Sequence, residues 1–259
     1  MLSEKYALLE ESLQALQKNS INLLCLCGAA GFGKSYTTMK YLEDHNADYA
    51  YFNTYSSPLA FYKNLYLNKD KNIIIFDDIQ NLDNPVIIAI LKAACWGILD
   101  NKRVVGWHTT SETFYKLGVD EDFILNANLI LIFNDTPKGF EPIINRSINI
   151  EFNFTYQEKL QIFQGLNLDP EILAYVKANC SEATENLSIR TIKILEKLKT
   201  DGFDWPKFAK EMLKNNEYGN ELVKLVSKYH ETKTICEEWI NATGKSRASF
   251  FRLKKKLNL

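Results

Sequence analysis

The segment from residue 28 to residue 35 has the residue types and spacing of a phosphate-binding loop. It reads Gly28-Ala-Ala-Gly-Phe-Gly33-Lys34-Ser35, which matches the pattern G-x-x-x-x-G-K-[S/T]. Glycines let such a loop turn its backbone N–H groups toward phosphate oxygens, the lysine supplies positive charge, and the serine hydroxyl can coordinate Mg²⁺. The sequence therefore predicts ATP and Mg²⁺ as cofactors. The residues expected to contact them are Gly28, Gly31, Phe32, Gly33, Lys34, Ser35 and Tyr36.

A pair of carboxylates ends an apolar run in the segment Ile73-Ile-Ile-Phe-Asp77-Asp78. The run is continuous and mostly β-branched, as in a strand that is buried on both faces of a sheet. Carboxylates at the carboxyl end of such a parallel strand lie where these sheets bind ligands. We expect Asp77 to hold Mg²⁺ through water and Asp78 to polarise the attacking water. The alternative is that both aspartates only cap the strand and begin a turn.

Charge is unevenly distributed along the chain. The net charge of the 259 residues is −1. The last 18 residues, 242–259, hold six lysines and arginines and no acidic residue, so they carry +6 and the other 241 residues carry −7. A basic end on an acidic body predicts that the end meets an anion, most often nucleic acid.

The basic end has the pattern of a helix-turn-helix, in which the second helix enters the major groove of DNA. Segment 233–244 is predicted to be a helix that ends at a turn glycine, and segment 246–257 a second helix that begins at a serine cap. The alternative is a basic amphipathic helix that docks on a partner protein or keeps the end soluble. The residues expected to form the core are Ile235, Trp239, Ile240, Phe250, Leu253 and Leu257. The residues expected to contact DNA are Lys245, Ser246, Arg247, Ser249, Arg252, Lys254, Lys255 and Lys256.

Alternating strands and helices must position the phosphate loop and the carboxylates. Several short runs are uniformly apolar, as in a parallel sheet that helices cover on both faces, so the predicted fold class is α/β. A long helix is predicted at 84–99. Strands are predicted at 21–27, 49–53, 72–76, 104–107, 129–133 and 148–154.

The pattern becomes helical after residue 154. Helix-start signals occur at Thr155, Asp169 and Asp204, and a further helix is predicted from Leu187 to Lys199. A linker that contains a glycine is predicted at 215–220. We expect three domains, which are an α/β nucleotide domain at 1–154, an α-helical lid at 155–215 and a helix-turn-helix domain at 216–259.

In the order of its motifs, the chain resembles the AAA+ ATPases over about residues 20–200. After the phosphate loop and the acidic strand end come an asparagine that follows Leu129-Ile-Leu-Ile-Phe, an arginine before the last strand, and an arginine in the helical part. The resemblance implies that Asn134 is the sensor-1 residue that orients the attacking water. It implies that Arg146 is an arginine finger and that Arg190 is a sensor-2 arginine. Many members have Asp-Glu where this chain has two aspartates, and the shorter Asp78 predicts slow hydrolysis.

The segment Phe76-Asp-Asp-Ile-Gln80 resembles the corresponding segment of the bacterial replication initiator and its relatives. This favours the initiator and helicase-loader branch of AAA+, with DNA and a helicase or another replication protein as partners. The implied role is ATP hydrolysis in replication initiation, helicase loading or a related remodelling of DNA. In the family the arginine finger comes from the neighbouring subunit, so Arg146 implies a homo-oligomeric ring or helical filament.

Two other functions remain open. A P-loop kinase or another small-molecule phosphotransferase would explain the phosphate loop, but it would leave Arg190 and the basic end without a role. A transcription or transposition regulator would use nucleotide only to switch its oligomeric state.

Composition narrows the class of protein further. Hydrophobic residues make up 46% of the chain and charged residues 24%, which excludes a largely disordered chain. No stretch approaches about 18 uninterrupted apolar residues, so we expect no membrane span. The expected location is the cytoplasm of a bacterial host cell, and a phage source would suit so compact a chain.

The segment 100–122 has two interpretations. AAA+ proteins often carry a pore loop or hairpin at this place that touches a central substrate. Alternatively, Trp107 packs in the core and His108 lies on the surface.

Overall fold

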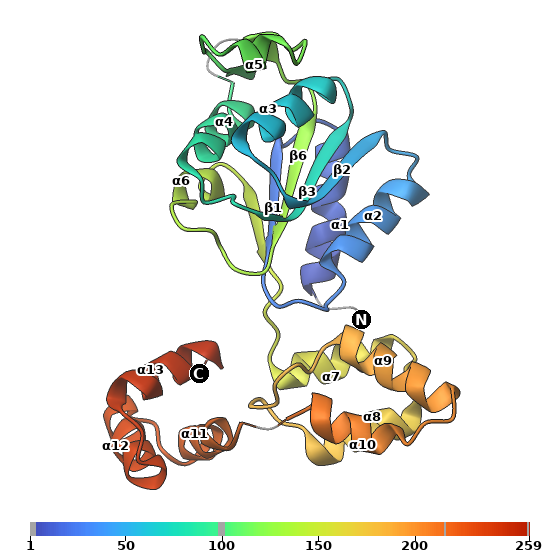
Figure 1. Ribbon diagram of the computed structural model, residues 1–259. Coiled ribbons are helices and arrows are strands. Elements are labelled where there is room, and N and C mark those ends of the chain that lie inside the picture. The colour runs from blue at the N-terminus through green and yellow to red at the C-terminus, as the bar shows by residue number, and fades with distance from the viewer. Residues whose placement is uncertain (1–3, 98–101, 215, 258) are drawn as a thin grey trace. The chain divides into compact units, whose positions relative to one another are not determined.

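The computed structural model describes residues 4–97, 102–214, 216–257 and 259. They divide into two compact units, residues 4–153 and 154–259 (Figure 1). The predicted division into three domains stays a prediction, since the second unit holds both of its helical parts. None of the described helices has both the length and the apolar composition that a bilayer span requires.

The first unit is built on a five-stranded parallel sheet with the strand order β2-β3-β6-β1-β7. Its central strands are buried along their apolar runs, as strands covered on both faces must be. The α/β parallel-sheet prediction is confirmed. The strands are β1 (Leu23–Cys27), β2 (Tyr49–Tyr55), β3 (Ile73–Gln80), β6 (Asn128–Phe133) and β7 (Ile148–Glu151).

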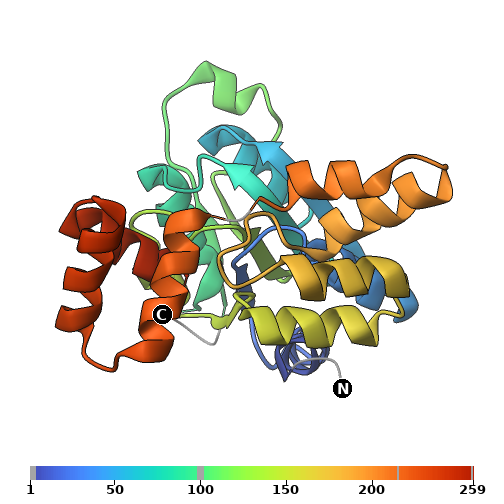
Figure 2. The ribbon, with the colours of Figure 1, turned by 90° about the horizontal axis from the view of Figure 1, so that it is seen from below.

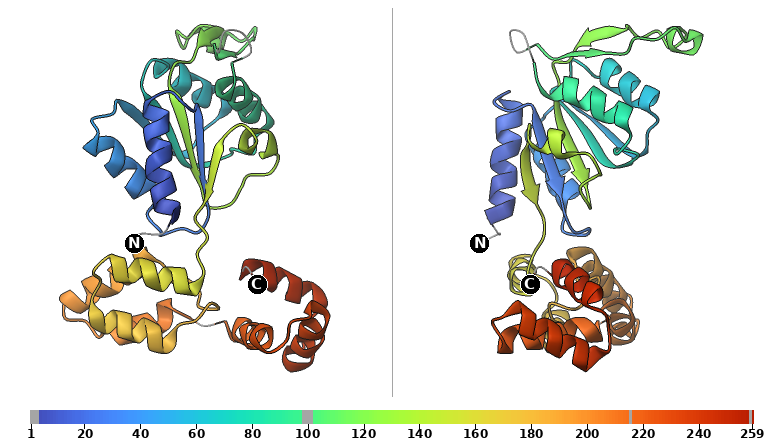
Figure 3. Two further views of the ribbon diagram at one scale, coloured as in Figure 1. Left: turned by 180° about the vertical axis from the view of Figure 1, so that it is seen from behind. Right: turned by 90° about the vertical axis from the view of Figure 1, so that its left-hand side faces the viewer.

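Helices cover the two faces of this sheet (Figure 3). On one face α1 packs against α2, and on the other α3 and α6 pack against α4. The ring of Phe76 on β3 stacks on Phe61 of α3, with ring centroids 4.3 Å apart. The helices are α1 (Glu4–Gln17), α2 (Lys34–Asp44), α3 (Pro58–Leu67), α4 (Pro85–Cys95) and α6 (Glu141–Ile144).

The strand predicted at 104–107 lies outside the main sheet. It forms β4 (Val104–Gly106), which pairs antiparallel with β5 (Asp122–Ile124), and the short helix α5 (Glu112–Tyr115) lies between them. The prediction that it joins the parallel sheet was wrong: only Val105 of its three residues is buried, and the segment pairs with 122–124 instead.

The insert between α4 and β6 supports the core interpretation of Trp107. Its ring stacks on Phe114 at 6.5 Å and lies 5.8 Å from the ring of Tyr62. His108 is exposed, with Nε2 3.5 Å from a carboxylate oxygen of Asp122. Arg103 is buried and donates to the carbonyl of Asn126 at 2.8 Å, and burial lowers the pKa of its guanidinium. Arg103 therefore anchors the base of the insert.

The helix predicted at 84–99 is shorter than expected. It begins after Asn84, whose side chain accepts from the N–H of Val86, and it ends at Cys95. Trp96 takes an extended backbone conformation, and residues 98–99 of the prediction lie outside the described residues.

The second unit begins with four helices, in the part of the chain that was predicted as a lid, and the helix starts predicted there are observed. Thr155 Oγ1 accepts from the N–H of Glu158, while the Glu158 carboxylate accepts from the N–H of Thr155 at 2.7 Å, which completes a capping box. The helices are α7 (Tyr156–Gly165), α8 (Pro170–Asn179), α9 (Ile189–Thr200) and α10 (Trp205–Met212).

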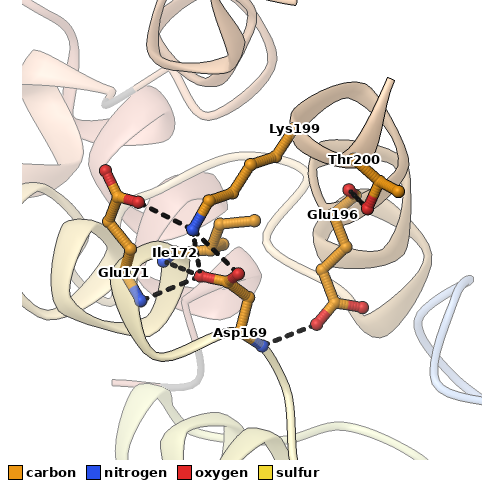
Figure 4. A network of polar contacts seen from close by, with 6 residues as sticks. All are labelled: Asp169, Glu171, Ile172, Glu196, Lys199 and Thr200. Atoms are coloured by element: carbon orange, nitrogen blue, oxygen red, sulfur yellow. Dashed lines mark hydrogen bonds and ion pairs between the residues drawn. The ribbon is translucent and has the colours of Figure 1, made fainter. Parts of the chain in front are cut away.

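A polar network around Asp169 ties α8 to α9 (Figure 4). Oδ1 of Asp169 accepts from the N–H groups of Glu171 at 2.9 Å and Ile172 at 3.2 Å, which caps α8. Both oxygens of the Asp169 carboxylate also accept from Lys199 Nζ at 2.8 Å. The hydrogen bond from Lys199 holds the pKa of Asp169 below its ordinary value. One carboxylate therefore starts one helix and fastens the end of another.

Three further helices surround a small apolar core (Figure 2). They are α11 (Glu217–Lys228), α12 (Thr232–Thr243) and α13 (Arg247–Lys256). Of the predicted core, Ile235, Trp239 and Phe250 are buried, and Ile240, Leu253 and Leu257 pack against them half-buried. The sequence analysis missed the contribution of α11, which comes from Leu222 and Leu225.

The linker predicted at 215–220 is largely helical. Residues 217–220 belong to α11, and residue 215 lies outside the described residues. Gly219 is buried against the lid, where an added Cβ would lie 2.8 Å from the Cβ of Ala183. Asn216 N–H donates to the carbonyl of Ala183 at 3.1 Å, and Ser181 Oγ donates to Asn220 Oδ1 at 2.8 Å. This glycine serves close packing, and the linker prediction was wrong.

We expect Gly28→Ala to destabilise the first unit strongly. At Gly28 the backbone has a φ of +121°, and an added Cβ would lie 2.8 Å from the backbone of Phe152. The left-handed conformation and the overpacking together should lower the free energy of unfolding by about 2–5 kcal/mol. Urea unfolding followed by circular dichroism measures this.

Gly118→Ala is the matched control, because its φ is +66° but no atom lies within 4 Å of the added Cβ. It should cost only about 1 kcal/mol. Equal losses in the two variants would show that the contact with Phe152, just after β7, does not constrain the loop.

Candidate nucleotide site and basic helix

The phosphate loop joins β1 to α2 in a conformation that only glycines adopt easily. Gly28, Gly31 and Gly33 have φ values of +121°, +82° and +76°. The N–H of Gly28 donates to the carbonyl of Asn134 at 3.1 Å, and the N–H of Phe152 donates to the carbonyl of Cys27 at 2.7 Å. The loop is therefore held between the ends of β6 and β7.

Lys34 lies inside this loop, with its side chain almost fully buried. Its Nζ donates to the carbonyls of Gly28 at 2.6 Å and Ala29 at 3.0 Å, and to Asn134 Oδ1 at 3.4 Å. Carbonyl oxygens are weaker partners for an ammonium group than charged phosphate oxygens are. The ammonium group is thus placed where it can exchange these partners for a phosphate.

Asp78 and Asn134 complete the same cluster. Asp78 is exposed and has a φ of +50°, at the point where β3 passes the edge of the sheet. The side-chain amide of Asn134 donates to Asp78 Oδ1 at 3.4 Å and accepts from Lys34 through its own oxygen. Three residues that come from separate motifs are therefore linked by hydrogen bonds. The sequence predicted all three.

Asp77 and Ser35 have the chemistry of a magnesium site. The Asp77 carboxylate is 7% exposed and lies opposite Ile132 of β6 in the sheet, and Ser35 stands half-buried in the first turn of α2. Both supply oxygen ligands, which Mg²⁺ prefers. Among the described residues, no group of three His, Cys, Asp or Glu side chains is arranged to hold a metal. This donor set fits Mg²⁺, which usually keeps several waters and takes phosphate oxygens as further ligands.

Tyr6 on α1 also contacts the phosphate loop, and it was not predicted from the sequence. Its hydroxyl donates to the carbonyl of Phe32 at 2.7 Å, and its ring meets Phe152 edge-on at 5.4 Å. The Phe32 side chain is buried, so Phe32 anchors the loop. Tyr36, the other aromatic residue expected to contact nucleotide, is 70% exposed. No local signal marked Tyr6, which lies 26 residues before Phe32.

The comparisons with known proteins can now be set beside this geometry. No family model matches the sequence. An uncharacterized 36.7 kDa protein of Enterobacteria phage T4 is 22% identical over 242 residues, which cover 80% of this chain and 73% of that protein. A variant of RuvB from Thermotoga maritima has a TM-score of 0.51 and 14% identity, over 95% of this chain and 84% of that chain.

The chain has the AAA+ fold. A second RuvB variant gives a TM-score of 0.50 at 16% identity, over 95% of this chain and 82% of that chain. Domain III of the Thermotoga maritima replication initiation protein DnaA gives 0.46 at 14% identity, over 82% of this chain and 94% of that chain. The lower score carries no argument about the branch of AAA+, so the assignment to the initiator branch stays a prediction.

Arg146 and Arg190, for which the AAA+ resemblance implies roles, lie in different units of the structure. Arg146 is exposed in the turn after α6, and its Nη1 donates to the carbonyl of Pro142 at 2.5 Å. Arg190 is exposed in the first turn of α9, in the second unit. The roles of both arginines stay predictions.

A three-residue turn joins α12 to the basic helix α13. Gly244 ends α12 with a φ of +66°, and Ser246 caps α13 by accepting from the N–H of Ser249 at 3.2 Å. Of the residues expected to contact DNA, Ser249 and Lys254 are half-buried and the side chain of Lys256 lies outside the described part of the structure. The exposed ones are Lys245, Ser246, Arg247, Arg252 and Lys255.

Arg247 and Lys245 each make a cation–π contact with an aromatic ring. Arg247 lies over the ring of Phe251 at 5.6 Å, and Lys245 lies over the ring of Tyr218 at 4.7 Å. Lys254 Nζ donates to Thr232 Oγ1 at 3.1 Å. The apolar side of α13 faces the small core, which leaves Arg247, Arg252 and Lys255 exposed, and their role in DNA binding stays a prediction.

Proposed function

We propose that this protein binds and hydrolyses ATP with Mg²⁺, and that it acts on DNA as an oligomer. The observation that carries the ATPase proposal is the chain of hydrogen bonds from Lys34 through Asn134 to Asp78. It joins a phosphate-binding cation to a carboxylate that can polarise water, at the mouth of one loop.

Each residue of the cluster has a distinct task in this proposal. Lys34 neutralises charge on the β and γ phosphates, while Ser35 and Asp77 would hold Mg²⁺, which would offset further phosphate charge. Asp78 accepts a hydrogen bond from the attacking water, and Asn134 orients the Asp78 carboxylate. An aspartate carboxylate reaches one methylene less far than that of a glutamate, so turnover should be slow.

The DNA proposal is supported by the charge and architecture of the C-terminal helices. Residues 242–259 carry +6, and Arg247, Arg252 and Lys255 are exposed on α13, after a short glycine turn. RuvB, which shares the fold, is described as a Holliday junction branch migration motor. We assign the protein to replication initiation, helicase loading or a related DNA-remodelling step, with a helicase or another replication protein as a candidate partner.

The similarity to a protein of phage T4 supports a phage source and a place of action in the bacterial cytoplasm. A transcription or transposition regulator that nucleotide switches is the second candidate. The short Asp78 side chain favours it, because slow hydrolysis suits a switch better than a motor.

Arg146 supports an oligomer in which neighbouring subunits share each ATP site. The Arg146 side chain is exposed to solvent. An arginine finger must be accessible in this way if it is to reach the γ-phosphate in a neighbouring subunit. Such contacts are heterologous and build a ring or a helical filament.

The ATPase proposal is tested with two substitutions in the cluster. Lys34→Ala should abolish binding of ATP, because it removes the phosphate-binding charge. Asp78→Asn keeps a residue that tolerates the left-handed backbone, so it should leave ATP affinity unchanged and lower kcat by about 100-fold. Fluorescence titration with an ATP analogue and a phosphate-release assay measure the two effects.

Asp83→Asn is the matched control, since it removes an exposed carboxylate five residues further along, in the loop after β3. It should retain the kcat of the wild type. Full turnover in Asp78→Asn would remove Asp78 from the mechanism, and ATP binding by Lys34→Ala would contradict the nucleotide site itself.

Subunit mixing tests the shared site. Arg146→Ala and Lys34→Ala should each be inactive alone. An equimolar mixture should regain part of the ATPase activity, because Arg146→Ala subunits supply intact loops to neighbours that supply an intact arginine. An Arg146→Ala variant with wild-type turnover would exclude the trans role, as would a mixture without regained activity.

DNA binding is tested through its salt dependence. Replacing both Arg252 and Lys255 with Ala should lower the slope of log K against log salt by about 2 and weaken binding to duplexes of any sequence. The double variant Lys207→Ala and Lys210→Ala removes the same exposed charge from α10 and should keep the wild-type slope. Equal slopes in all three proteins, by fluorescence anisotropy, would show that α13 does not contact DNA.

A further inference from the structure

Tyr51 lies beside the carboxylate that we assign to magnesium, although it belongs to none of the sequence motifs. Its hydroxyl donates to Asp77 Oδ2 at 2.8 Å. The phenol is the donor of this pair, and the carboxylate oxygen accepts.

The register of the sheet explains why a tyrosine at this position reaches Asp77. Strand β2 pairs with β3 in parallel, so that Asn53 lies opposite Asp77 and Tyr51 lies opposite Ile75. Residues two apart in a strand project on the same face, about 6.6 Å from each other along the strand. The phenol spans this separation, which a shorter side chain at position 51 would not.

The contact restricts what the Asp77 carboxylate can do. The side chain is almost fully buried, and one of its two oxygens accepts from Tyr51. A carboxylate has about four lone-pair sites, so the other oxygen keeps its acceptor capacity for a metal-bound water. With Oδ2 held in place, rotation of the carboxylate about its Cβ–Cγ bond breaks a buried hydrogen bond.

We propose that Tyr51 is a positioning residue that fixes the Asp77 carboxylate for Mg²⁺ in the nucleotide site. The inference rests on the proposed ATP and Mg²⁺ binding. Partners that orient a metal-binding carboxylate typically contribute 10- to 100-fold to metal affinity. Tyr51 acts through Asp77 and has no role in contacting the phosphates.

Tyr51→Phe tests this role, with Tyr49→Phe as the matched control. Tyr49 lies two residues earlier on β2, and its hydroxyl donates to a carboxylate outside the site, Glu43 Oε1 at 3.3 Å. Each protein binds a fluorescent ATP analogue in EDTA and then at increasing Mg²⁺ concentration. Tyr51→Phe should need roughly tenfold more Mg²⁺ for its half-maximal response, while its affinity in EDTA stays that of the wild type. Tyr49→Phe should match the wild type in both measurements.

A second measurement distinguishes positioning from a purely structural effect. In an Asp77→Asn background, Tyr51→Phe should cause no further change in the Mg²⁺ response, because the residue through which it acts has already been altered. An additive change would overturn the inference, and so would equal weakening of binding with and without Mg²⁺.

The inference and the proposed function fail in different ways. If the wild type does not bind the analogue, the proposed ATP site is wrong. If the wild type binds it with a clear Mg²⁺ dependence and Tyr51→Phe shows the same dependence, only the positioning role is overturned.

Discussion

The ammonium group of Lys34 has to be surrounded by oxygen atoms, because a cation this deeply buried is costly without hydrogen-bond partners. Two of its partners are carbonyls of its own loop, which turn inward because three glycines take left-handed backbone angles. The third comes from the residue after β6. The placement of β1 between β6 and β7 is what brings these partners to one point. Lys34 can therefore be buried only because the strand order places oxygen partners around its ammonium group.

Features that depend on neighbouring residues in the chain were predictable from the sequence. The glycine turn after β1 and the caps at Thr155 and Asp169 each need only a few adjacent residues, and the structure has the turn and both caps. Asn134 was identified by its place in the order of motifs, and the sheet brings it to Lys34 and Asp78.

Features that depend on strand register or on distant packing were not predictable. Tyr51 reaches Asp77 because β2 and β3 pair in one register, which no local pattern encodes. The residues 104–106 have the composition of a sheet strand, yet they pair with 122–124 outside the main sheet, and no local pattern indicates that partner. Gly219 has the composition of a flexible joint, but its missing side chain allows the close approach of Ala183.

That close approach gives the second unit a mechanical property. The first turn of α11 is hydrogen-bonded to the loop before α9 and packs against it, so α11 is fixed to the lid by direct contacts. A rotation of the lid would therefore carry α11 with it, together with α12 and α13, which pack in turn on α11 and α12. An insertion before α11 that broke these contacts would let the lid and the C-terminal helices move independently, although neither part would itself be altered.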